Sequence, residues 1–216
     1  MIFVLIASIL IPSQITIAHT NRVRDLASIH HDKRIVQARE LLGKGYKKSI
    51  VSKSEDKKDL EDKLLEIVLK KLPNEYKSSS REIAHAIIVE ATKRSLDPYF
   101  LAAVIAGESN FDPKAIGSVG EIGMMQIRPK TAQWVAEIHG IKWKGKKSLF
   151  DPFYNIKLGA AYLSWLREKF DNQGQLYLAA YNMGPKSVKL ALARKIKPKE
   201  YSMHVMKRYI AFYGKI

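Results

Sequence analysis

The carboxyl group best placed for chemistry in this sequence is that of Glu108. It stands near the end of the run YFLAAVIAGES, which begins at Tyr99 and is almost wholly apolar. Burial disfavours the charged form of a carboxyl group, and the negative end of a helix acts in the same direction. A carboxyl group that stays protonated near neutral pH is a general acid. The alternative is that Glu108 turns outward where its helix reaches the surface.

Helices are expected to position this residue. The run from Tyr99 to about Ser109 is apolar on all sides, which is typical of a helix in the middle of a core. Asp97 and Pro98 supply its cap and first turn, and Asp151 with Pro152 repeats the device for a long helix to about Phe170. Other helices are predicted over residues 35–46, 60–72, 80–93, 129–140, 175–181, 185–195 and 201–213. The helix over 80–93 opens on a capping box between Ser79 and Glu82. No segment shows sustained period-two alternation, so the predicted fold class is mainly α.

Four short motifs follow one another along the second half of the chain. They are the pair Glu108-Ser109, the loop from Gly117 to Gln126 (GSVGEIGMMQ), the segment from Asp151 to Tyr162, and the segment from Ala179 to Pro185 (AAYNMGP). In this order they resemble the soluble lytic transglycosylase catalytic domain, whose members carry a Glu-Ser pair, a Gly-x-x-Gly-x-Met-Gln loop and an Ala-Tyr-Asn-x-Gly segment. The resemblance covers about residues 80–213. Met124 replaces the usual leucine, and Gly107 precedes the glutamate where bulkier residues are usual.

This resemblance implies a lysozyme-like helical fold with a groove for a β-1,4-linked aminosugar strand. Glu108 would be the catalytic acid and base. The implied substrate-binding residues are Ser109, Met125, Gln126, Tyr181, Asn182 and Tyr201, with His204 a weaker candidate for the place of Tyr201. Structural roles compete with some of these assignments: Met124 is expected in the core, Tyr181 is a possible core aromatic, and Asn182 is a possible helix C-cap.

The number of carboxyl groups favours a lyase over a hydrolase. Ordinary glycoside hydrolysis uses two carboxylates that flank the bond, whereas the matched motifs supply Glu108 alone. Asp112 lies beyond the predicted helix break, so Glu121 in the glycine-rich loop is the main rival. With one carboxyl group, the nucleophile comes from the substrate and a 1,6-anhydro end results. The alternatives are a goose-type lysozyme, which shares the fold and the use of one glutamate but hydrolyses the bond, and a non-enzymatic basic protein that binds cell-wall polymer or nucleic acid. Analysis of the products separates the lysozyme from the lyase.

Composition narrows the class of protein and its partners. The 216 residues are 46% hydrophobic and carry a formal net charge of +16. This composition supports a buried core, and the charge attracts polyanions. Cysteine is absent and the six histidines have no metal-ligand spacing, so neither a metal nor a cofactor is predicted. The expected partner is the peptidoglycan glycan strand, with cell-envelope machinery a further candidate, and no nucleic acid.

The first residues point to export. Met1 to Ile11 form an apolar run too short to span a bilayer, which takes about 20 residues. Residues 1–18 are therefore predicted to be a signal peptide or a short membrane anchor, with small residues for cleavage near Ala18. No Lys or Arg precedes Arg22, and a buried N-terminal strand or helix is the alternative. Residues 19–78 are predicted to be a basic, partly helical extension, and residues 79–216 the catalytic domain. The predicted location is the periplasm or cell envelope.

Overall fold

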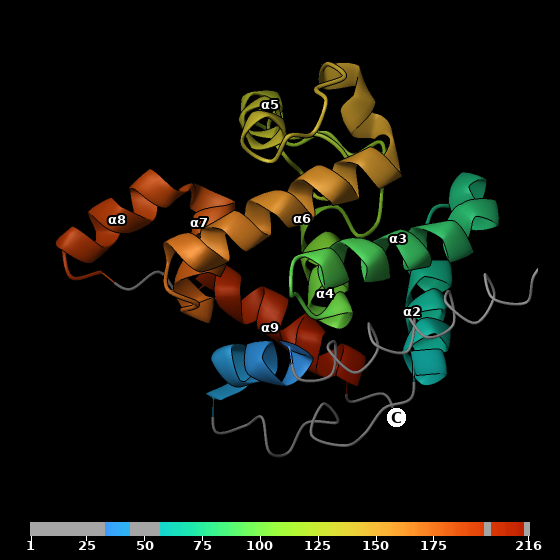
Figure 1. Ribbon diagram of the computed structural model, residues 1–216, viewed down its shortest axis with the longest axis horizontal. Helices are drawn as coiled ribbons and strands as arrows, with labels where there is room; N and C mark the ends of the chain where they lie inside the picture. Colours follow the sequence, from blue (N-terminus) through green and yellow to red (C-terminus); the bar gives the residue numbers. More distant parts are fainter. Residues whose placement is uncertain (1–32, 44–56, 197–199, 214–216) are drawn as a thin grey trace, which may run out of the picture.

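The computed structural model describes residues 33–43, 57–196 and 200–213, and these are overwhelmingly helical (Figure 1). Strand pairing among them is limited to two isolated bridges, Ile116–Ile122 and Ile122–Ile127. This confirms the predicted mainly-α class. The elements are a helix over residues 33–42 followed by α2 (Lys57–Lys71), η3 (Asn74–Ser79), α3 (Ser80–Lys93), α4 (Pro98–Glu108), α5 (Pro129–Ile138), η4 (Lys146–Phe150), α6 (Pro152–Lys169), α7 (Gly174–Met183), α8 (Pro185–Ala193) and α9 (Glu200–Tyr213).

Helix α4 is the centre of the core, as its uniformly apolar sequence predicts. Every residue from Pro98 to Ala106 is buried, and helices α2, α3 and α9 pack around it (Figure 1). Its N-terminus is capped by Asp97, whose Oδ1 accepts a hydrogen bond from the Tyr99 amide at 2.8 Å. Glu108 is the last residue of the helix. The core therefore fixes the direction of α4 and places the carboxyl group where the helix leaves it.

The capping box predicted at the start of α3 is wrong in its contacts, although the helix begins where expected. Ser79 makes no side-chain cap hydrogen bond, and its φ of −96° and ψ of 13° are not the extended values of an N-cap. The reason is the preceding 3-10 helix η3, which runs directly into α3. The hydroxyl of Ser80 instead donates to the Lys77 carbonyl.

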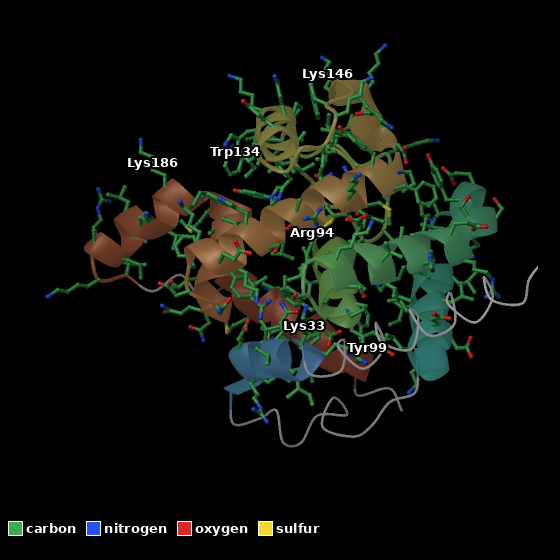
Figure 2. The ribbon with its side chains drawn as sticks, in the orientation of Figure 1. Lys33, Arg94, Tyr99, Trp134, Lys146 and Lys186 are labelled. Carbon is green, nitrogen blue, oxygen red and sulfur yellow. The ribbon has the colours of Figure 1, made fainter. Side chains whose placement is uncertain are left out.

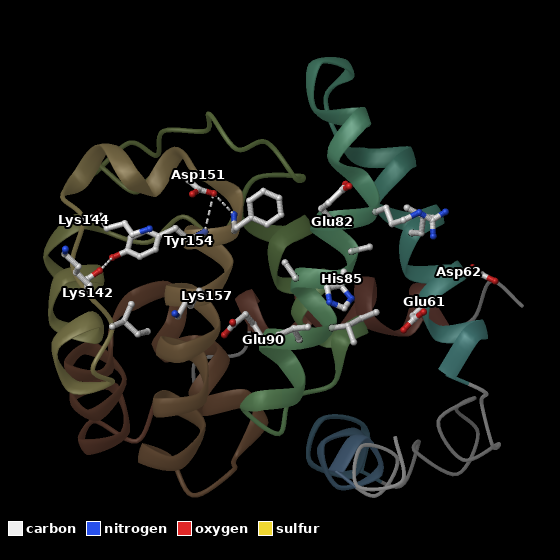
Figure 3. A pocket seen from close by; sticks show the side chains of 18 residues that line it. Glu61, Asp62, Glu82, His85, Glu90, Lys142, Lys144, Asp151, Tyr154 and Lys157 are labelled. Carbon is white, nitrogen blue, oxygen red and sulfur yellow. Dashed lines mark hydrogen bonds between the residues drawn. The ribbon is translucent and has the colours of Figure 1, made fainter. Parts of the chain in front are cut away.

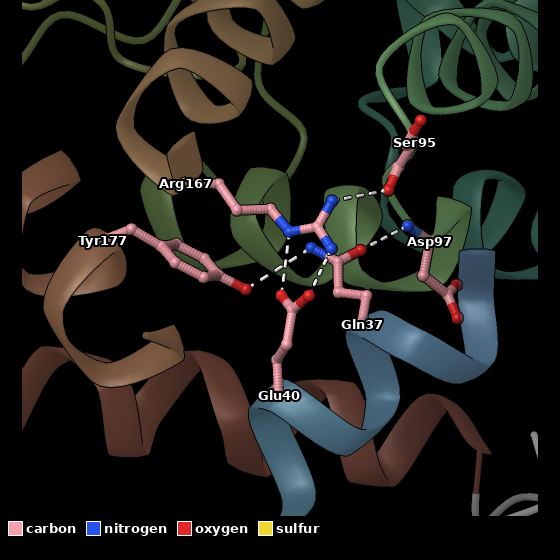
Figure 4. Close-up of polar contacts among 6 residues, drawn as sticks. All are labelled: Gln37, Glu40, Ser95, Asp97, Arg167 and Tyr177. Carbon is pink, nitrogen blue, oxygen red and sulfur yellow. Dashed lines mark hydrogen bonds and ion pairs between the residues drawn. The ribbon is translucent and has the colours of Figure 1, made fainter. Parts of the chain in front are cut away.

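The helix over residues 33–42 packs against the second half of the chain and the start of α4 through buried polar contacts (Figure 4). Gln37 accepts a hydrogen bond from the Asp97 amide and donates to the Tyr177 hydroxyl at 3.4 Å. Glu40 pairs with Arg167, whose Nε lies 2.8 Å from its Oε2. These contacts join residues up to 140 positions apart. The domain boundary at residue 79 stays a prediction, but this helix packs as part of the same body.

The described helices do not include one that is long and apolar enough to cross a bilayer. The apolar run from Met1 to Ile11 lies outside the described residues, as does most of the segment between the first two helices. Figure 2 shows two of the basic side chains of the described part, Lys146 and Lys186, at the periphery of the molecule. The signal peptide or anchor stays a prediction.

Candidate active site

A pocket of about 260 Å³ lies at the C-terminal end of α4. Glu108 lines it and is half-buried. The other walls come from the loop before α5, from α6, and from the junction of α7 with α8. Their polar side chains include Glu121, Gln126, Arg128, Tyr162, Tyr181 and Asn182, together with Thr131 at the start of α5. The pocket therefore brings Glu108 together with three of the predicted binding residues, Gln126, Tyr181 and Asn182.

Tyr181 forms the inner wall of this pocket and holds the loop beneath it. Its hydroxyl donates to the Met125 carbonyl at 2.8 Å, and 8% of the residue is exposed. Its ring lies 5.5 Å from that of Tyr162. Burial, and then the negative charge of Glu108, raise the pKa of Tyr181 well above its ordinary value. The phenol therefore stays neutral next to the carboxyl group and remains a hydrogen-bond donor.

The loop over residues 117–128, here called the glycine loop, is shaped by Gln126. This residue adopts a left-handed conformation with φ of 45°, which is uncommon for a residue with a side chain. Its Nε2 donates to the carbonyls of Ala115 at 3.1 Å and Gly123 at 2.9 Å. The Gln126 amide thus joins the end of the glycine loop to its middle and to the segment that precedes it. Gln126 also lines the pocket.

Asn155, on α6, holds the same loop by hydrogen bonds to its backbone. It was not among the predicted site residues. The side chain is fully buried. Its Oδ1 accepts from the Met125 amide at 2.7 Å, and its Nδ2 donates to the carbonyls of Ile122 and Leu149, both at 2.8 Å. Gly123 has a φ of 78°, and a Cβ there would overlap both Leu149 and Asn155. An amide in a mostly apolar helix is the signal that could have identified this role.

Ser109 and Met125 are not among the residues that line the pocket. The Ser109 hydroxyl donates to the Met124 carbonyl at 2.8 Å, which ties the end of α4 to the glycine loop. Met125 is fully buried and packs against Gly159 of α6, where a Cβ would overlap its side chain. Met124 is fully buried too, which confirms its expected place in the core. Ser109 and Met125 therefore hold the glycine loop against α4 and α6 and do not line the pocket themselves.

Glu121 is the second carboxylate in the pocket, but it is held as an anion. Its Oε1 accepts from Arg128 Nε at 2.9 Å, and its Oε2 accepts from the Val119 amide at 3.2 Å. Burial favours the neutral form of Glu121, but hydrogen bonds from its own backbone amide, from Arg128 and from Val119 outweigh it. The pKa of Glu121 therefore lies below its ordinary value. A carboxylate held in this way is a poor general acid.

The remaining predicted residues lie at the rim or outside the described side chains. Asn182 is exposed and lines the pocket. Its predicted role as a helix C-cap is wrong, because α7 continues to Met183 and Gly184 caps it with a φ of 85°. The Tyr201 side chain lies outside the described residues, and His204 is exposed on α9. A Cβ at Gly107 would meet Val205 of α9 at 3.6 Å, an ordinary contact, so space alone does not require glycine before Glu108.

The described residues contain no group of three or more His, Asp or Glu side chains placed to hold a metal ion. The acidic side chains of the pocket are Glu108 and Glu121, and Arg128 already neutralises the second. The arrangement offers a proton donor and acceptor at Glu108 within a partly enclosed, polar pocket.

Comparison with known proteins places these features in a family. The family model described as "Transglycosylase SLT domain" matches residues 85–203. The soluble lytic murein transglycosylase of Escherichia coli K12 is 35% identical over 91 residues, which are 42% of this chain and 14% of that protein. A transglycosylase of Enterobacteria phage PRD1 is 34% identical over 122 residues, 56% of this chain and 40% of that protein. The chain thus matches less than half the length of these relatives.

Solved structures agree with this assignment. A lytic transglycosylase of Pseudomonas aeruginosa, described as an inactive glutamate-to-glutamine mutant, superposes with a TM-score of 0.54 and 31% identity, over 61% of this chain and 24% of that one. The 70 kDa soluble lytic transglycosylase of Escherichia coli gives a TM-score of 0.56 over 76% of this chain and 31% of that one. At 23% identity, the second likeness shows the fold alone.

Proposed function

Because the chain belongs to the transglycosylase SLT domain family, we propose that it is a peptidoglycan lytic transglycosylase. In this proposal it cleaves the β-1,4 bond between N-acetylmuramic acid and N-acetylglucosamine without water. The product end is a 1,6-anhydro-N-acetylmuramoyl residue. The proposal places the protein outside the cytoplasm, in the periplasm or cell envelope, where its substrate lies.

The observation that carries this proposal is the contrast between the two carboxyl groups of the pocket. Glu108 stands at the negative end of α4, half-buried beside the neutral phenol of Tyr181. Glu121 is engaged by Arg128 and a backbone amide. Retaining and inverting hydrolases both need a second carboxylate as nucleophile or base. In this pocket Arg128 already holds the second carboxylate, that of Glu121. The pocket therefore suits a reaction whose nucleophile belongs to the substrate.

The proposed reaction uses Glu108 twice. In the first step, its carboxyl group protonates the glycosidic oxygen, and the bond from that oxygen to C1 of the muramoyl residue breaks. The N-acetyl group of the same sugar supports the positive charge at C1. In the second step, the Glu108 carboxylate takes the proton from the C6 hydroxyl, and O6 bonds to C1. The proton lost in the first step is regained in the second, so the enzyme is unchanged and no water is consumed.

The other pocket residues hold the sugar during these steps. Asn182 and Gln126 offer amide groups at the rim, and a buried amide hydrogen bond to substrate contributes about 1 kcal/mol. The glycine loop sets the position of Gln126, and Asn155 and Tyr181 in turn hold that loop. The Pseudomonas relative is described as inactive when one of its glutamates is replaced by glutamine, which supports a role for a glutamate in the reaction.

A goose-type hydrolase is the second candidate function, and one observation favours it. Glu121 lines the same pocket as Glu108. It would have to release Arg128 to act as a base on water. The pair of variants Glu108→Gln and Glu121→Gln separates these roles.

The test is release of soluble muropeptides from purified sacculi by wild type and both variants. General acid–base catalysis contributes about 10²–10⁴-fold, and here one group serves both steps, so Glu108→Gln should fall to background. Glu121→Gln should keep activity within about tenfold of wild type, because it contributes an ion pair and no proton transfer. Equal activity of Glu108→Gln and wild type would remove Glu108 from the mechanism.

A further inference from the structure

Helix α8 projects from the edge of the molecule and packs mainly against α7 (Figure 1). Val188 is its one buried residue. A surface helix of a globular protein usually buries a broad apolar stripe against the core, whereas the large side chains of Leu190 and Leu192 on α8 are exposed. Neither side chain lines the pocket at Glu108, so the proposed reaction gives this surface no role.

The exposed apolar side chains lie close together in the chain. Leu190 is 53% exposed, Leu192 37%, and Ile196, just beyond the end of the helix, 57%. A single exposed apolar side chain is ordinary. A group of them bordered by polar residues is typical of a surface that meets a membrane or another protein.

The same surface is basic. The chain between Asp171 and Glu200 contains neither Asp nor Glu. Residues three and four apart share one face of a helix, so Lys186, Lys189 and Leu190 lie on the same side of α8. Within the described residues, no carboxylate pairs with the exposed cations of this surface. These cations are Lys186, Lys189, Arg194 and Lys195.

A second cation-rich segment, residues 142–147, has different surroundings (Figure 3). Lys142 and Lys144 line a pocket of about 900 Å³ together with several carboxylates, among them that of Asp151. The carboxylates offset part of the positive charge there, and Trp143 is partly buried. The combination of unopposed cations with exposed aliphatic side chains therefore distinguishes α8 from this segment.

This combination favours a lipid surface over a soluble polyanion. A polyanion would match the cations but would leave the exposed leucine and isoleucine side chains in water. A bilayer with anionic lipids offers phosphate groups to Lys and Arg, and the boundary of its acyl chains to Leu and Ile. Each Lys or Arg near such a surface strengthens binding about fivefold.

We propose that α8 and the residues up to Ile196 form a docking surface for an anionic lipid bilayer, with Leu190 and Ile196 at the boundary of the acyl chains and the cations at lipid phosphates. Gly184, which lines the Glu108 pocket, directly precedes α8, so the bilayer would lie close to that pocket. The inference goes beyond the proposed function and does not depend on it. It also differs from anchoring by residues 1–18, because it uses a folded surface.

A local fluorescent label tests this surface in the full chain. The sequence contains no cysteine, so Ala193→Cys gives a single attachment point for a polarity-sensitive fluorophore at an exposed position of α8. Lys70→Cys is the matched control, because Lys70 is exposed on α2, at the opposite end of the molecule (Figure 1). The probes are vesicles of phosphatidylglycerol and phosphatidylcholine in equal parts.

The emission of the label on α8 should shift to the blue on these vesicles, whereas that of the label on α2 should not. Because the signal is local, binding through residues 1–18 alone does not produce it. An unshifted label on α8 in vesicle-bound protein, or an equal shift at both positions, would overturn the proposal.

Substitutions next to the label test the two kinds of contact. Leu190→Gln should raise the lipid concentration at half-maximal shift about tenfold, because it removes a large apolar side chain. Lys189→Gln should raise it about fivefold. Leu69→Gln changes an exposed leucine of α2 and should have no effect. An unchanged lipid requirement in Leu190→Gln, or an equal shift on pure phosphatidylcholine, would overturn the proposal.

Two further measurements separate the other candidate occupants and the proposed function. An equal shift with soluble polyaspartate would show a general polyanion site and overturn the assignment to lipid. On purified sacculi without lipid, Leu190→Gln should release muropeptides at the wild-type rate, because Leu190 lies outside the Glu108 pocket. A lower rate would assign α8 to the wall and overturn the assignment to lipid. Vesicle binding by a chain that cleaves no glycan would contradict the proposed reaction and leave the docking surface intact.

Discussion

The two ends of α4 carry two carboxyl groups with opposite surroundings. Asp97, before the first turn, is fully buried, and Tyr99, Tyr209 and Arg34 all contact its carboxylate. Glu108, at the last turn, is half-buried and faces a pocket. The positive end of a helix stabilises an anion, whereas the negative end favours the neutral form. One helix thus places a carboxylate that stabilises the fold at one end and a candidate proton donor at the other.

The largest expected effect on stability comes from removal of Asp97, the carboxylate at the start of α4. Asp97→Ala deletes a cap and removes the buried carboxylate that Arg34 and Tyr209 contact. Breaking a buried pair is unfavourable by about 3–5 kcal/mol, and urea unfolding should show a loss of this size. Asp151→Ala is the control, because exposed Asp151 only caps α6 and should lose about 1 kcal/mol. Equal losses would mean that the contacts around Asp97 add nothing beyond the cap.

A smaller loss of stability is expected when Asn155, which holds the glycine loop, is replaced. Asn155→Ala removes the hydrogen bonds to the Met125 amide and to the Ile122 and Leu149 carbonyls. The Ile122 carbonyl still accepts from the Ile127 amide at 3.3 Å. Each unsatisfied buried group is unfavourable by about 1–3 kcal/mol. Calorimetry should show a lower Tm, and sacculus turnover per folded molecule should fall because the glycine loop is no longer held. An unchanged kcat at a lowered Tm would limit Asn155 to stability.

Substitutions of the polar residues at the rim of the pocket should lower activity more than stability. Asn182→Ala should lower kcat/KM about tenfold with the fold intact, because it removes about one hydrogen bond to substrate. Gln126→Ala should lower kcat/KM by at least as much, because it also removes the hydrogen bonds from its amide to the Ala115 and Gly123 carbonyls. Gln175→Ala is the control on the same helix, since Gln175 is exposed and outside the pocket. If either variant unfolds, or turns over like Gln175→Ala, its residue has a structural role instead.

The smallest expected effect concerns Glu121 and pH. Its folded pKa lies below its ordinary value, so its stabilising contribution is present above about pH 4.3 and is lost as pH falls through the folded pKa. Glu121→Gln should therefore lower stability at neutral pH by less than about 1 kcal/mol and converge with wild type in acid. Thermal melts from neutral to acidic pH measure this. A gap that widens in acid would have the wrong sign.

Sequence alone predicted the elements whose signals are local. The apolar run of α4, the caps Asp97 and Asp151, and the position of Met124 are confirmed. The errors at Ser79 and Asn182 arise where a neighbouring segment determines the helix end. The 3-10 helix η3 runs straight into α3, and Gly184 is the C-cap of α7, two residues after Asn182.

Contacts between distant segments could not be predicted in this way. Nothing near Gln37 or Glu40 in the chain indicates that they meet Tyr177 and Arg167. The ion pair between Glu121 and Arg128 depends on the path of the glycine loop. This path depends in turn on Asn155 from another helix. Motif order therefore located the pocket, whereas the roles within it depend on tertiary contacts.

The most direct test of the central claim is digestion of sacculi by the wild-type protein in ¹⁸O-labelled water, followed by mass spectrometry of the muropeptides. Ring closure by the C6 hydroxyl predicts products that are lighter by one water than those of a lysozyme and carry no label. Hydrolysis would add water at C1 and give reducing ends that carry one ¹⁸O. Labelled reducing ends as the primary products would contradict the lyase mechanism, even if Glu108 proved essential.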